Sequence, residues 1–390
     1  MRALLVITAF LLSACATKPL GPVESLAKQG KKRYVVWSKS QFVKASDGKI
    51  SGMSAGTLGA ILNSTGGRYV TALDRINGFI IEAPVTSQIS SSGSDWQITP
   101  EVEYHTFQST CQKVTPITCP VTPGPTPDPT PTPTPQPIEV AKSWGITRVR
   151  ANEAKAVVDT SNVKVCIVDT GTDLNHPNKG AVIGSIGYAG AVQDGNGHGT
   201  HTSGTVGGTG GVGVSRAKLL ICKGLSDSGS GSSIGLAQCL TWCGAQGAQI
   251  VSNSWGSSQS DPLINQAITS LTQKGIYVFV ANGNDGGPVN WPARLAGSNP
   301  LVYAVAASTQ SDTIASFSSR GDETRYIAPG TGIISNWPGG STRALDGTSM
   351  ATPHAAGVCA YGVARGLKPC IKTNGSISGY PVPDALTTAQ

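Results

Sequence analysis

Three residues far apart in the chain have the types and surroundings that nucleophilic catalysis requires: Asp169, His198 and Ser349. A serine hydroxyl is a weak nucleophile at neutral pH, so it needs a base within hydrogen-bond reach and a third group that orients the base. Ser349 stands within residues 347–354, Gly-Thr-Ser-Met-Ala-Thr-Pro-His. The small residues there favour a closely packed helix, and Gly347 favours a tight turn into it.

The other two residues lie where secondary-structure elements are expected to end or begin. Residues 163–168 form a short β-branched run that predicts a buried parallel strand, and Asp169 follows at its carboxyl end. Open α/β sheets carry their chemistry at that edge. His198 lies between glycines, before an Ala/Gly/Thr/Ser-rich segment that favours a helix packed on the sheet. His198 is therefore the predicted base, and Asp169 the group that orients it.

The motifs around these residues resemble the signatures of the subtilisin-like serine proteases. They are residues 168–171 (Val-Asp-Thr-Gly), 198–201 (His-Gly-Thr-His) and 347–354. Their order, Asp then His then Ser, is that of subtilisin. The similarity covers residues 142–367, and residues 339–343 and 360–361 are more similar to the proteinase K branch. It implies a three-layer α/β/α catalytic domain with a mostly parallel sheet, preceded by a small α+β propeptide domain.

Each motif alone also fits a simpler structural role. Aspartates after strands, histidines between glycines and Gly-Thr-Ser runs are common in loop caps, turns and helix caps. Three matches in one compatible order favour catalysis, because short independent motifs rarely coincide in such an order.

The resemblance also implies a donor for the oxyanion of the tetrahedral intermediate. Asn284, in the polar turn after the apolar run 278–281, matches the family's oxyanion asparagine. Its side-chain amide would act together with the backbone amide of Ser349. Asn282 is the alternative donor, and an asparagine that only closes a turn is the structural alternative.

Two further segments are expected to bind the substrate by analogy with the family. They are Ser228, Gly229, Ser230 and Gly231, and Ser254, Trp255 and Gly256. In relatives they present free backbone edges, so a peptide laid between them would add as a β-strand and make bonds that ignore its side chains. We therefore expect broad specificity for protein and peptide substrates. An apolar pocket near Asn290 and Trp291 is expected for the residue before the scissile bond.

Composition limits the other classes of function. The 390 residues are 39% apolar and 13% charged, which allows a large core and about two or three domains. The net charge of +7 comes from dispersed Lys and Arg, with no basic run longer than residues 31–33. Nucleic-acid binding is therefore not expected.

The chain begins with an export signal. A basic start and an apolar run too short to span a bilayer predict a secretory signal over residues 1–15. Residues 12–15 resemble the bacterial lipobox, which implies lipidation of Cys15 and possible membrane anchoring; the alternative is ordinary signal cleavage near Ala14. The predicted location is exported, either secreted or as a cell-envelope lipoprotein.

Residues 33–107 have a mixed α/β pattern, with strands expected at 34–37, 67–70 and 76–82 and a helix at 54–62. The pattern is similar to the inhibitor-type propeptide of subtilisin-like proteases. This resemblance implies an intramolecular partner that assists folding and blocks the site, so that the enzyme is an autoprocessed zymogen. A separate small binding domain is the alternative.

A proline-rich linker, residues 120–137, is expected to separate this domain from the peptidase domain, residues 142–390. Glycosylation of this segment and its recognition by a proline-binding groove are alternatives, but a plain linker is favoured. Relatives join propeptide and protease almost directly, so the linker leaves the activation cleavage site open.

Metal binding has little support in the sequence. Catalysis of this type requires no cofactor, and no metal ligand is predicted. Residues 207–215 form a short glycine-rich loop where longer-looped bacterial subtilisins hold calcium, Asn178 stands where many relatives have an acid, and Arg325 occupies a second acidic calcium-linked position. Because calcium requires oxygen ligands, no specific calcium site is predicted.

Eight cysteines remain besides Cys15, and an even number in an exported chain favours disulfides. Cys111 with Cys119, and Cys359 with Cys370, are close enough in sequence to close short loops. The other four are Cys166, Cys222, Cys239 and Cys243, and the pairing of all eight stays open, because eight cysteines allow 105 connectivities. The spacing of Cys239 and Cys243 also fits a metal site, but no histidine accompanies them, which favours a structural role.

Three rival functions differ in class from a serine endopeptidase. A non-catalytic, peptide-binding pseudoprotease is disfavoured by the complete set of Asp169, His198 and Ser349. An esterase with the same triad is disfavoured by the extended peptide-binding segments. An inhibitor resembling a propeptide is disfavoured by the size of residues 142–390.

Overall fold

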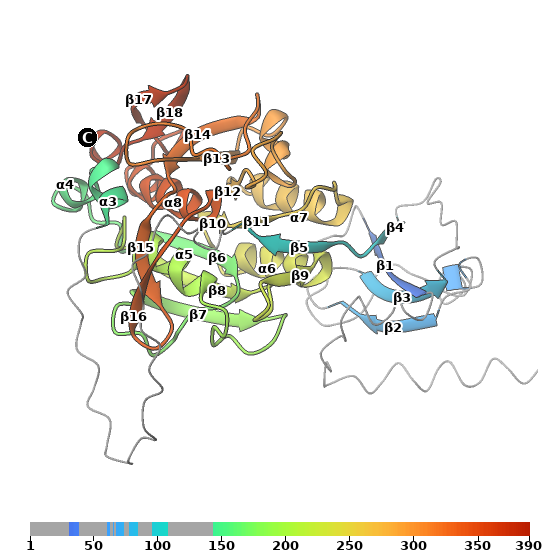
Figure 1. Ribbon diagram of the computed structural model, residues 1–390. Helices are drawn as coiled ribbons and strands as arrows, with labels where there is room; N and C mark the ends of the chain where they lie inside the picture. The colour runs from blue at the N-terminus through green and yellow to red at the C-terminus, as the bar shows by residue number, and fades with distance from the viewer. Residues whose placement is uncertain are drawn as a thin grey trace, which may run out of the picture.

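The computed structural model describes residues 31–38, 61–62, 65, 68–73, 78–84, 96–107 and 143–390 (Figure 1). The predicted signal over 1–15 with Cys15, most of the expected helix at 54–62, the linker at 120–137 and the pair Cys111 and Cys119 lie outside the described residues. Within the described part of the chain, no helix combines the length and the apolar character needed to cross a bilayer.

A seven-stranded sheet forms the middle layer of the peptidase domain. Its strands all run parallel, in the order β14-β13-β12-β10-β6-β8-β7. The strands are β6 (Lys164–Asp169), β7 (Ala181–Gly187), β8 (Lys218–Lys223), β10 (Ile250–Asn253), β12 (Tyr277–Ala281), β13 (Val302–Ser308) and β14 (Thr324–Pro329). The predicted parallel sheet is confirmed, and β6 ends at Asp169, as its β-branched run predicts.

Helices cover both faces of this sheet, so the predicted three-layer α/β/α architecture is confirmed. Figure 1 shows α5 (His198–Gly207) and α8 (Thr348–Ala364) on one side, and α6 (Ser233–Ala245) and α7 (Pro262–Thr272) on the other. The short helices α3 (Trp144–Arg148), α4 (Ala151–Lys155) and α9 (Ala385–Ala389) join the first side.

Side chains of β6 alternate between the two layers of core. Val165 and Ile167 belong to the cluster formed with α5 and α8, whereas Cys166 and Val168 belong to the cluster formed with α6 and α7. Successive residues of a strand point to opposite faces, so a strand buried on both faces must be apolar throughout. This requirement explains the continuous apolar run before Asp169.

Smaller elements complete the domain around its edges. Two antiparallel hairpins are formed by β15 (Ile333–Trp337) with β16 (Ser341–Leu345), and by β17 (Thr373–Ile377) with β18 (Tyr380–Pro383). A 3₁₀ helix, η2, spans Ala293–Gly297. The side chain of Asp261 caps α7 by accepting from the amides of Leu263 and Ile264, as expected for an N-cap aspartate.

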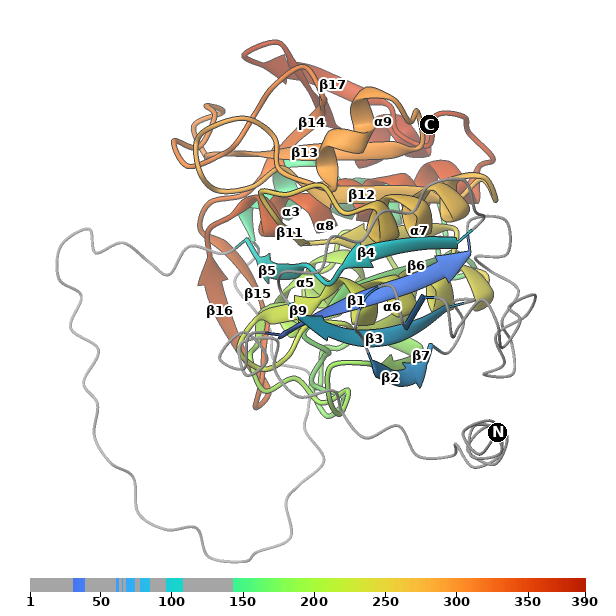
Figure 2. The same ribbon diagram turned by 90° about the vertical axis from the view of Figure 1, so that its right-hand side faces the viewer.

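A separate antiparallel sheet precedes the peptidase domain, in the order β2-β3-β1-β4. Its strands are β1 (Lys31–Ser38), β2 (Arg68–Ala72), β3 (Gly78–Pro84) and β4 (Trp96–Pro100), and they contain most of each predicted strand. Val35, Trp37 and Ile80 belong to the same buried cluster as residues of α6 and α7. Figure 2 shows this sheet in front of those two helices. The sheet is therefore docked on the peptidase domain.

One strand leaves this sheet and enters the peptidase domain. β5 (Glu103–Thr106) pairs antiparallel with β9 (Ser230–Ser232) on one side and β11 (Trp255–Gly256) on the other. Residues 102–104 close the α/β pattern in the sequence, but in the fold β5 belongs to the three-stranded sheet β11-β5-β9. The chain itself therefore occupies the space between the two segments that we expected to bind substrate.

Three disulfides lie in the peptidase domain: Cys166–Cys243, Cys222–Cys239 and Cys359–Cys370. Cys359 and Cys370 are one of the two pairs that lie close enough in sequence to close a short loop, and the structure joins them. The other two bonds join β6 and β8 to α6, which gives Cys239 and Cys243 the structural role that was favoured. Within the described residues, no cluster of three or more His, Cys, Asp or Glu side chains could hold a metal ion.

Candidate active site

The carboxylate of Asp169 and the imidazole of His198 are joined by a buried hydrogen bond. His198 Nδ1 lies 2.7 Å from Asp169 Oδ1, and both side chains are at most 1% exposed. Asp169 also accepts from the amide of Thr170 at 2.7 Å and from Thr202 Oγ1 at 3.0 Å. These donors fix the carboxylate at the end of β6. There it binds Nδ1 of His198 and leaves Nε2 available for proton transfer.

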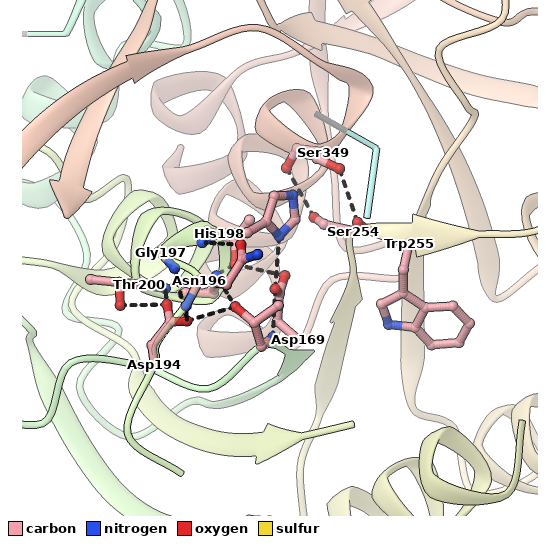
Figure 3. A network of polar contacts seen from close by, with 12 residues as sticks. Asp169, Asp194, Asn196, Gly197, His198, Thr200, Ser254, Trp255 and Ser349 are labelled. Atoms are coloured by element: carbon pink, nitrogen blue, oxygen red, sulfur yellow. Dashed lines mark hydrogen bonds and ion pairs between the residues drawn. The ribbon is translucent and has the colours of Figure 1, made fainter. Parts of the chain in front are cut away.

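The loop that delivers His198 is organised by a second buried aspartate, Asp194. Its Oδ1 accepts from the amides of Asn196 at 3.0 Å and Gly197 at 2.9 Å, and its Oδ2 accepts from the amide of Thr200 at 2.8 Å (Figure 3). Amides at a helix start lack partners within the helix, so a carboxylate stabilises them there. Asp194 stands just before the histidine motif in the sequence, yet its role was not foreseen; an acid ahead of a Gly-x-Gly-His turn was the available signal.

Ser349 is the second residue of α8, as the small-residue motif predicts. Pro353 lies inside this helix and has no N–H to donate to the carbonyl four residues earlier, which is that of Ser349. Ser254 Oγ donates to this carbonyl at 2.9 Å, and Ser349 Oγ donates to the carbonyl of Ser254 at 2.9 Å. Two reciprocal bonds therefore fasten the start of α8 to the segment before β11.

Figure 3 shows the imidazole of His198 between Asp169 and Ser349. His198 Nε2 is buried and has no hydrogen-bond partner among the described residues. The hydroxyl of Ser349 instead donates to Ser254 and accepts from the backbone amide of Phe107 at 3.0 Å. The structure thus brings the three predicted residues to one place, with the hydroxyl directed to Ser254 rather than to the imidazole.

Of the five histidines, only His198 pairs with a carboxylate in the part of the chain that is described. His201 and His354 are fully buried, and burial lowers the pKa of His201 to about 3 and that of His354 to about 4, which keeps both rings neutral. His176 contacts the carbonyl of Ser341 at 2.8 Å. Local geometry therefore distinguishes the predicted base from His201, three residues further on.

The two candidate oxyanion donors differ in what their amide groups already bind. Asn284 Oδ1 accepts from the amide and hydroxyl of Thr348 at 3.0 and 2.9 Å, whereas its Nδ2 is buried with no described partner. Asn282 Nδ2 donates to the carbonyl of Ser319 at 3.1 Å and to Thr324 Oγ1 at 2.8 Å. The backbone amide of Ser349 also donates to no described residue. Asn284 can therefore supply a donor, while the donors of Asn282 are already used.

The two segments expected to bind substrate flank β5. His105 pairs with Ser230 and Gly256, and Tyr104 pairs with Gly231. The amide of Thr106 donates to the carbonyl of Gly229 at 3.0 Å. Ser228 makes no bond to β5; its hydroxyl contacts those of Ser226 and Ser230 at 2.7 and 2.9 Å. Main-chain pairing along both edges of β5 is the geometry of β-strand addition.

The next residue, Phe107, lies at the nucleophile. Its amide lies 3.4 Å from the carbonyl of Ser254 and 3.0 Å from Ser349 Oγ. A Cβ added to Gly256 would lie 2.5 Å from the ring of Phe107 and 2.6 Å from the carbonyl of Trp291. The missing side chain of Gly256 therefore makes room for the aromatic ring, beside the carbonyl of Trp291. Asn290 Nδ2 donates to Asp285 Oδ2 at 2.6 Å.

Tyr104 fills a second pocket, three residues before Phe107. It is fully buried and meets the indole of Trp255 edge-on at a ring-centroid distance of 5.2 Å. The indole donates to the carbonyl of Val168 at 2.9 Å. Sequence reasoning did not foresee Tyr104 and Phe107 as occupants of these pockets. Two aromatic residues within the last four positions of the expected propeptide were the available signal.

The chain belongs to the Subtilase family, which it matches over residues 160–367. The three-layer fold agrees with this family, and the resemblance to it seen in the sequence motifs is confirmed.

Similar proteins come from bacteria and fungi. The chain is 41% identical to Subtilisin Savinase of Lederbergia lenta and to M-protease of Shouchella clausii, each over 226 residues and 56% of this chain. It is 39% identical to a subtilisin-like protease of Coccidioides posadasii over 249 residues, or 59% of this chain. The match covers 82% of Savinase but only 58% of M-protease and 61% of the fungal protein.

Asn178 and Arg325, which stand at positions linked to calcium in relatives, make hydrogen bonds to protein groups. Arg325 donates from its guanidinium to the carbonyl of Ala296 at 2.5 Å, so a positive charge already lies beside that oxygen. The carbonyl of Asn178 accepts from the amide of Thr209 at 3.0 Å and from Asn336 Nδ2 at 2.7 Å.

Proposed function

We propose that the protein is an exported serine endopeptidase, made as a zymogen, in which Ser349, His198, Asp169 and Asn284 carry out peptide-bond hydrolysis. The observation that carries this proposal is the position of β5 between β9 and β11, with the amide of Phe107 at 3.0 Å from Ser349 Oγ. A substrate strand in the same register would present the carbonyl of the residue at Phe107 to the nucleophile.

The reaction follows from the groups at this point. Ser349 Oγ turns from the Ser254 carbonyl toward the free His198 Nε2, gives up its proton there and attacks the substrate carbonyl carbon. Asp169 holds Nδ1 and stabilises the imidazolium that forms. Asn284 Nδ2 and the amide of Ser349, both without described partners, donate to the oxyanion.

Collapse of the tetrahedral intermediate completes the first half of the reaction. The C–N bond breaks, His198 gives its proton to the leaving amine, and an ester to Ser349 remains. Water, deprotonated by His198, then attacks the ester, and a second tetrahedral intermediate releases the carboxylic acid. The Asp169 carboxylate keeps the imidazole oriented through both halves.

The bond between Phe107 and Gln108 is the proposed first substrate. Residues 104–107 fill the strand position and both pockets, so the carbonyl of Phe107 is the one presented to Ser349. After cleavage the new carboxyl end would stay as an inhibitor, held by the main-chain bonds of β5 and by the docked sheet β2-β3-β1-β4. Residues 33–107 would then act as an intramolecular inhibitor, and activation would require their release.

The export signal and lipobox extend this proposal to location. If Cys15 is lipidated, the anchor lies on the propeptide side of the cut, and the linker at 120–137 stays with the released enzyme. The uncut precursor should fractionate with membranes, and the processed enzyme should be soluble. Fractionation of cells that express Cys15→Ser tests the anchor; equal solubility of the two uncut precursors would exclude it.

Replacement of the nucleophile tests the proposed activity. Purified Ser349→Ala protein should remain an uncut precursor and should cleave casein or a short peptide at less than about a hundredth of the wild-type rate. Wild-type protein, expressed without other proteases, should give a new amino terminus at Gln108. Activity on esters with none on peptides would favour the esterase alternative, and a folded wild type that cleaves neither would favour a peptide-binding pseudoprotease.

A further inference from the structure

A cavity of about 610 Å³ lies away from the proposed active site. Its walls come from α4, the start of β7 and the turn after α5, and they include Lys155, Lys179 and Arg216 together with the glycines Gly210 and Gly211. No aspartate or glutamate is among its lining residues. The cavity therefore concentrates positive charge where the short glycine-rich loop runs.

The three cations form no ion pair with any residue that the structure describes. Within the described residues, no carboxylate lies within ion-pair distance of Lys155, Lys179 or Arg216. Lys155 Nζ donates to the carbonyl of Gly213, and Arg216 Nη1 donates to the carbonyl of Lys155 at 2.9 Å. Most of their N–H groups therefore remain available to a ligand.

The like charges of Lys155 and Arg216 and the partial burial of Lys155 make the charged form of this lysine less favourable unless an anion binds nearby. Burial and the positive charge of Arg216 lower the pKa of Lys155 to about 8. The nearest acid, Asp159, is exposed, and its carboxylate accepts from the amide and hydroxyl of Ser161 at 2.9 and 2.7 Å. A bound anion would favour the charged form of Lys155.

The backbone adds neutral donors to the same wall. Gly210 and Gly211 both have left-handed φ angles, +67° and +90°, which glycine adopts without strain. The amides of Gly210 and Gly211, which line the cavity, donate to no described residue. Successive free amides in such turns form concave sites for anions. The carboxyl end of α5 lies at this turn, but its dipole amounts to only about half a negative charge, which three cations outweigh.

We propose that this cavity binds a multiply charged oxyanion of the phosphate class, held by Lys155, Lys179 and Arg216 and by the free amides of Gly210 and Gly211. A dianion matches the unpaired positive charge, whereas a divalent cation would be repelled. The ligand would join α4, β7 and the turn, and so would stabilise the fold without contact with Ser349. The inference does not depend on the proposed peptidase activity.

Thermal unfolding of the full chain carrying Ser349→Ala, which prevents self-digestion, tests the site. Sodium phosphate should raise Tm with a saturable dependence, by about 5 °C or more at a hundred times its Kd, relative to sodium chloride of equal ionic strength. Sulfate should act similarly if charge and shape suffice. The rise should disappear in Lys155→Met and Arg216→Gln and persist in Lys372→Gln, a control at an exposed lysine outside the cavity.

Titration calorimetry at pH 8 gives a second readout. Because the anion favours protonated Lys155, phosphate binding should take up protons, seen as different apparent enthalpies in buffers of different ionisation enthalpy. Lys179→Gln changes the third cation of the cavity and serves if Lys155→Met fails to fold; it should weaken the binding of phosphate at least tenfold. Equal effects of phosphate and sodium chloride, or an undiminished phosphate effect in all three cavity variants, would overturn the proposal.

Discussion

The backbone amide of Phe107 lies 3.0 Å from Ser349 Oγ and donates a hydrogen bond to it, so two residues 242 positions apart meet at the proposed nucleophile. Ser349 Oγ accepts this hydrogen bond and donates its own to the carbonyl of Ser254. Together they hold Ser349 in a position where it has not engaged His198. In the proposed zymogen, the segment that is cleaved first is therefore also the segment that contacts the nucleophile.

The ring of Phe107 should control the rate of this first cleavage. Phe107→Asp would place a charge against Gly256 and the carbonyl of Trp291, where a carboxylate is poorly solvated. We expect the uncut precursor to accumulate, with processing at least about a hundredfold slower, while Phe107→Tyr processes near the wild-type rate. Pulse-chase labelling followed by amino-terminal sequencing measures both. An unchanged terminus and rate in Phe107→Asp would show that another bond is cut.

The neighbouring asparagines should have separable roles. Asn284→Ala removes the free Nδ2 and should lower kcat by about 10²–10³ with little change in KM. Asn282→Ala removes bonds to Ser319 and Thr324 and should mainly reduce the free energy of unfolding, by about 1–3 kcal/mol. Steady-state kinetics and urea unfolding of both variants distinguish them. A larger loss of kcat in Asn282→Ala would reverse the assignment of the donor.

Tyr104 should contribute to retention of the propeptide after cleavage. Its ring is buried against Trp255, but its hydroxyl has no described partner, and a buried unpaired hydroxyl costs about 1–3 kcal/mol. Tyr104→Phe should therefore slow release of the cut propeptide, whereas Tyr104→Ala should speed it. The lag before activity appears in processed samples measures release. Faster activation of Tyr104→Phe than of wild type would mean that the hydroxyl has an essential partner.

Inhibition by the propeptide should weaken as pH rises. Burial raises the pKa of Glu101 above 4.5 despite Arg33, and burial also raises the pKa of Asp261 across the same interface. A carboxyl with a higher pKa in the docked state binds protons more tightly there. Docking is therefore strongest below the ordinary pKa and is progressively lost as pH rises through the raised one.

Glu101→Gln tests this dependence. Its side chain stays neutral, so the part of the pH dependence due to Glu101 should vanish, while Arg33 keeps Glu82 at 3.7 Å. Glu103→Gln, at an exposed position on β5, removes only a minor contributor to the raised pKa of Glu101 and should therefore reduce the pH dependence much less than Glu101→Gln does. Size-exclusion chromatography of processed protein between pH 4 and 8 separates bound from released propeptide. Tighter docking at pH 8 than at pH 5 in wild type would contradict the expected sign.

Much of the architecture around the site follows from short patterns. The β-branched run predicts a buried strand that ends at Asp169, and the small-residue motif predicts the helix start at Ser349, because each pattern reflects a local packing requirement. The choice between Asn282 and Asn284 does not follow, since both occupy one turn and only their side-chain partners separate them. The path of β5 was equally hidden, because β-strand pairing over more than a hundred residues leaves no local pattern.

The bond Cys166–Cys243 has a consequence for a protease that is surrounded by copies of itself, as we propose for this protein. The exposed turn residues Thr209 and Gly211 lie between Cys166 and Cys243 in the chain. A peptide bond broken in this turn would leave both new ends attached to one covalent framework, with Asp169 and His198 on one piece and Ser349 on the other. A single cleavage in this turn would then release no fragment. The cleaved molecule would keep Asp169, His198 and Ser349 in one covalent unit.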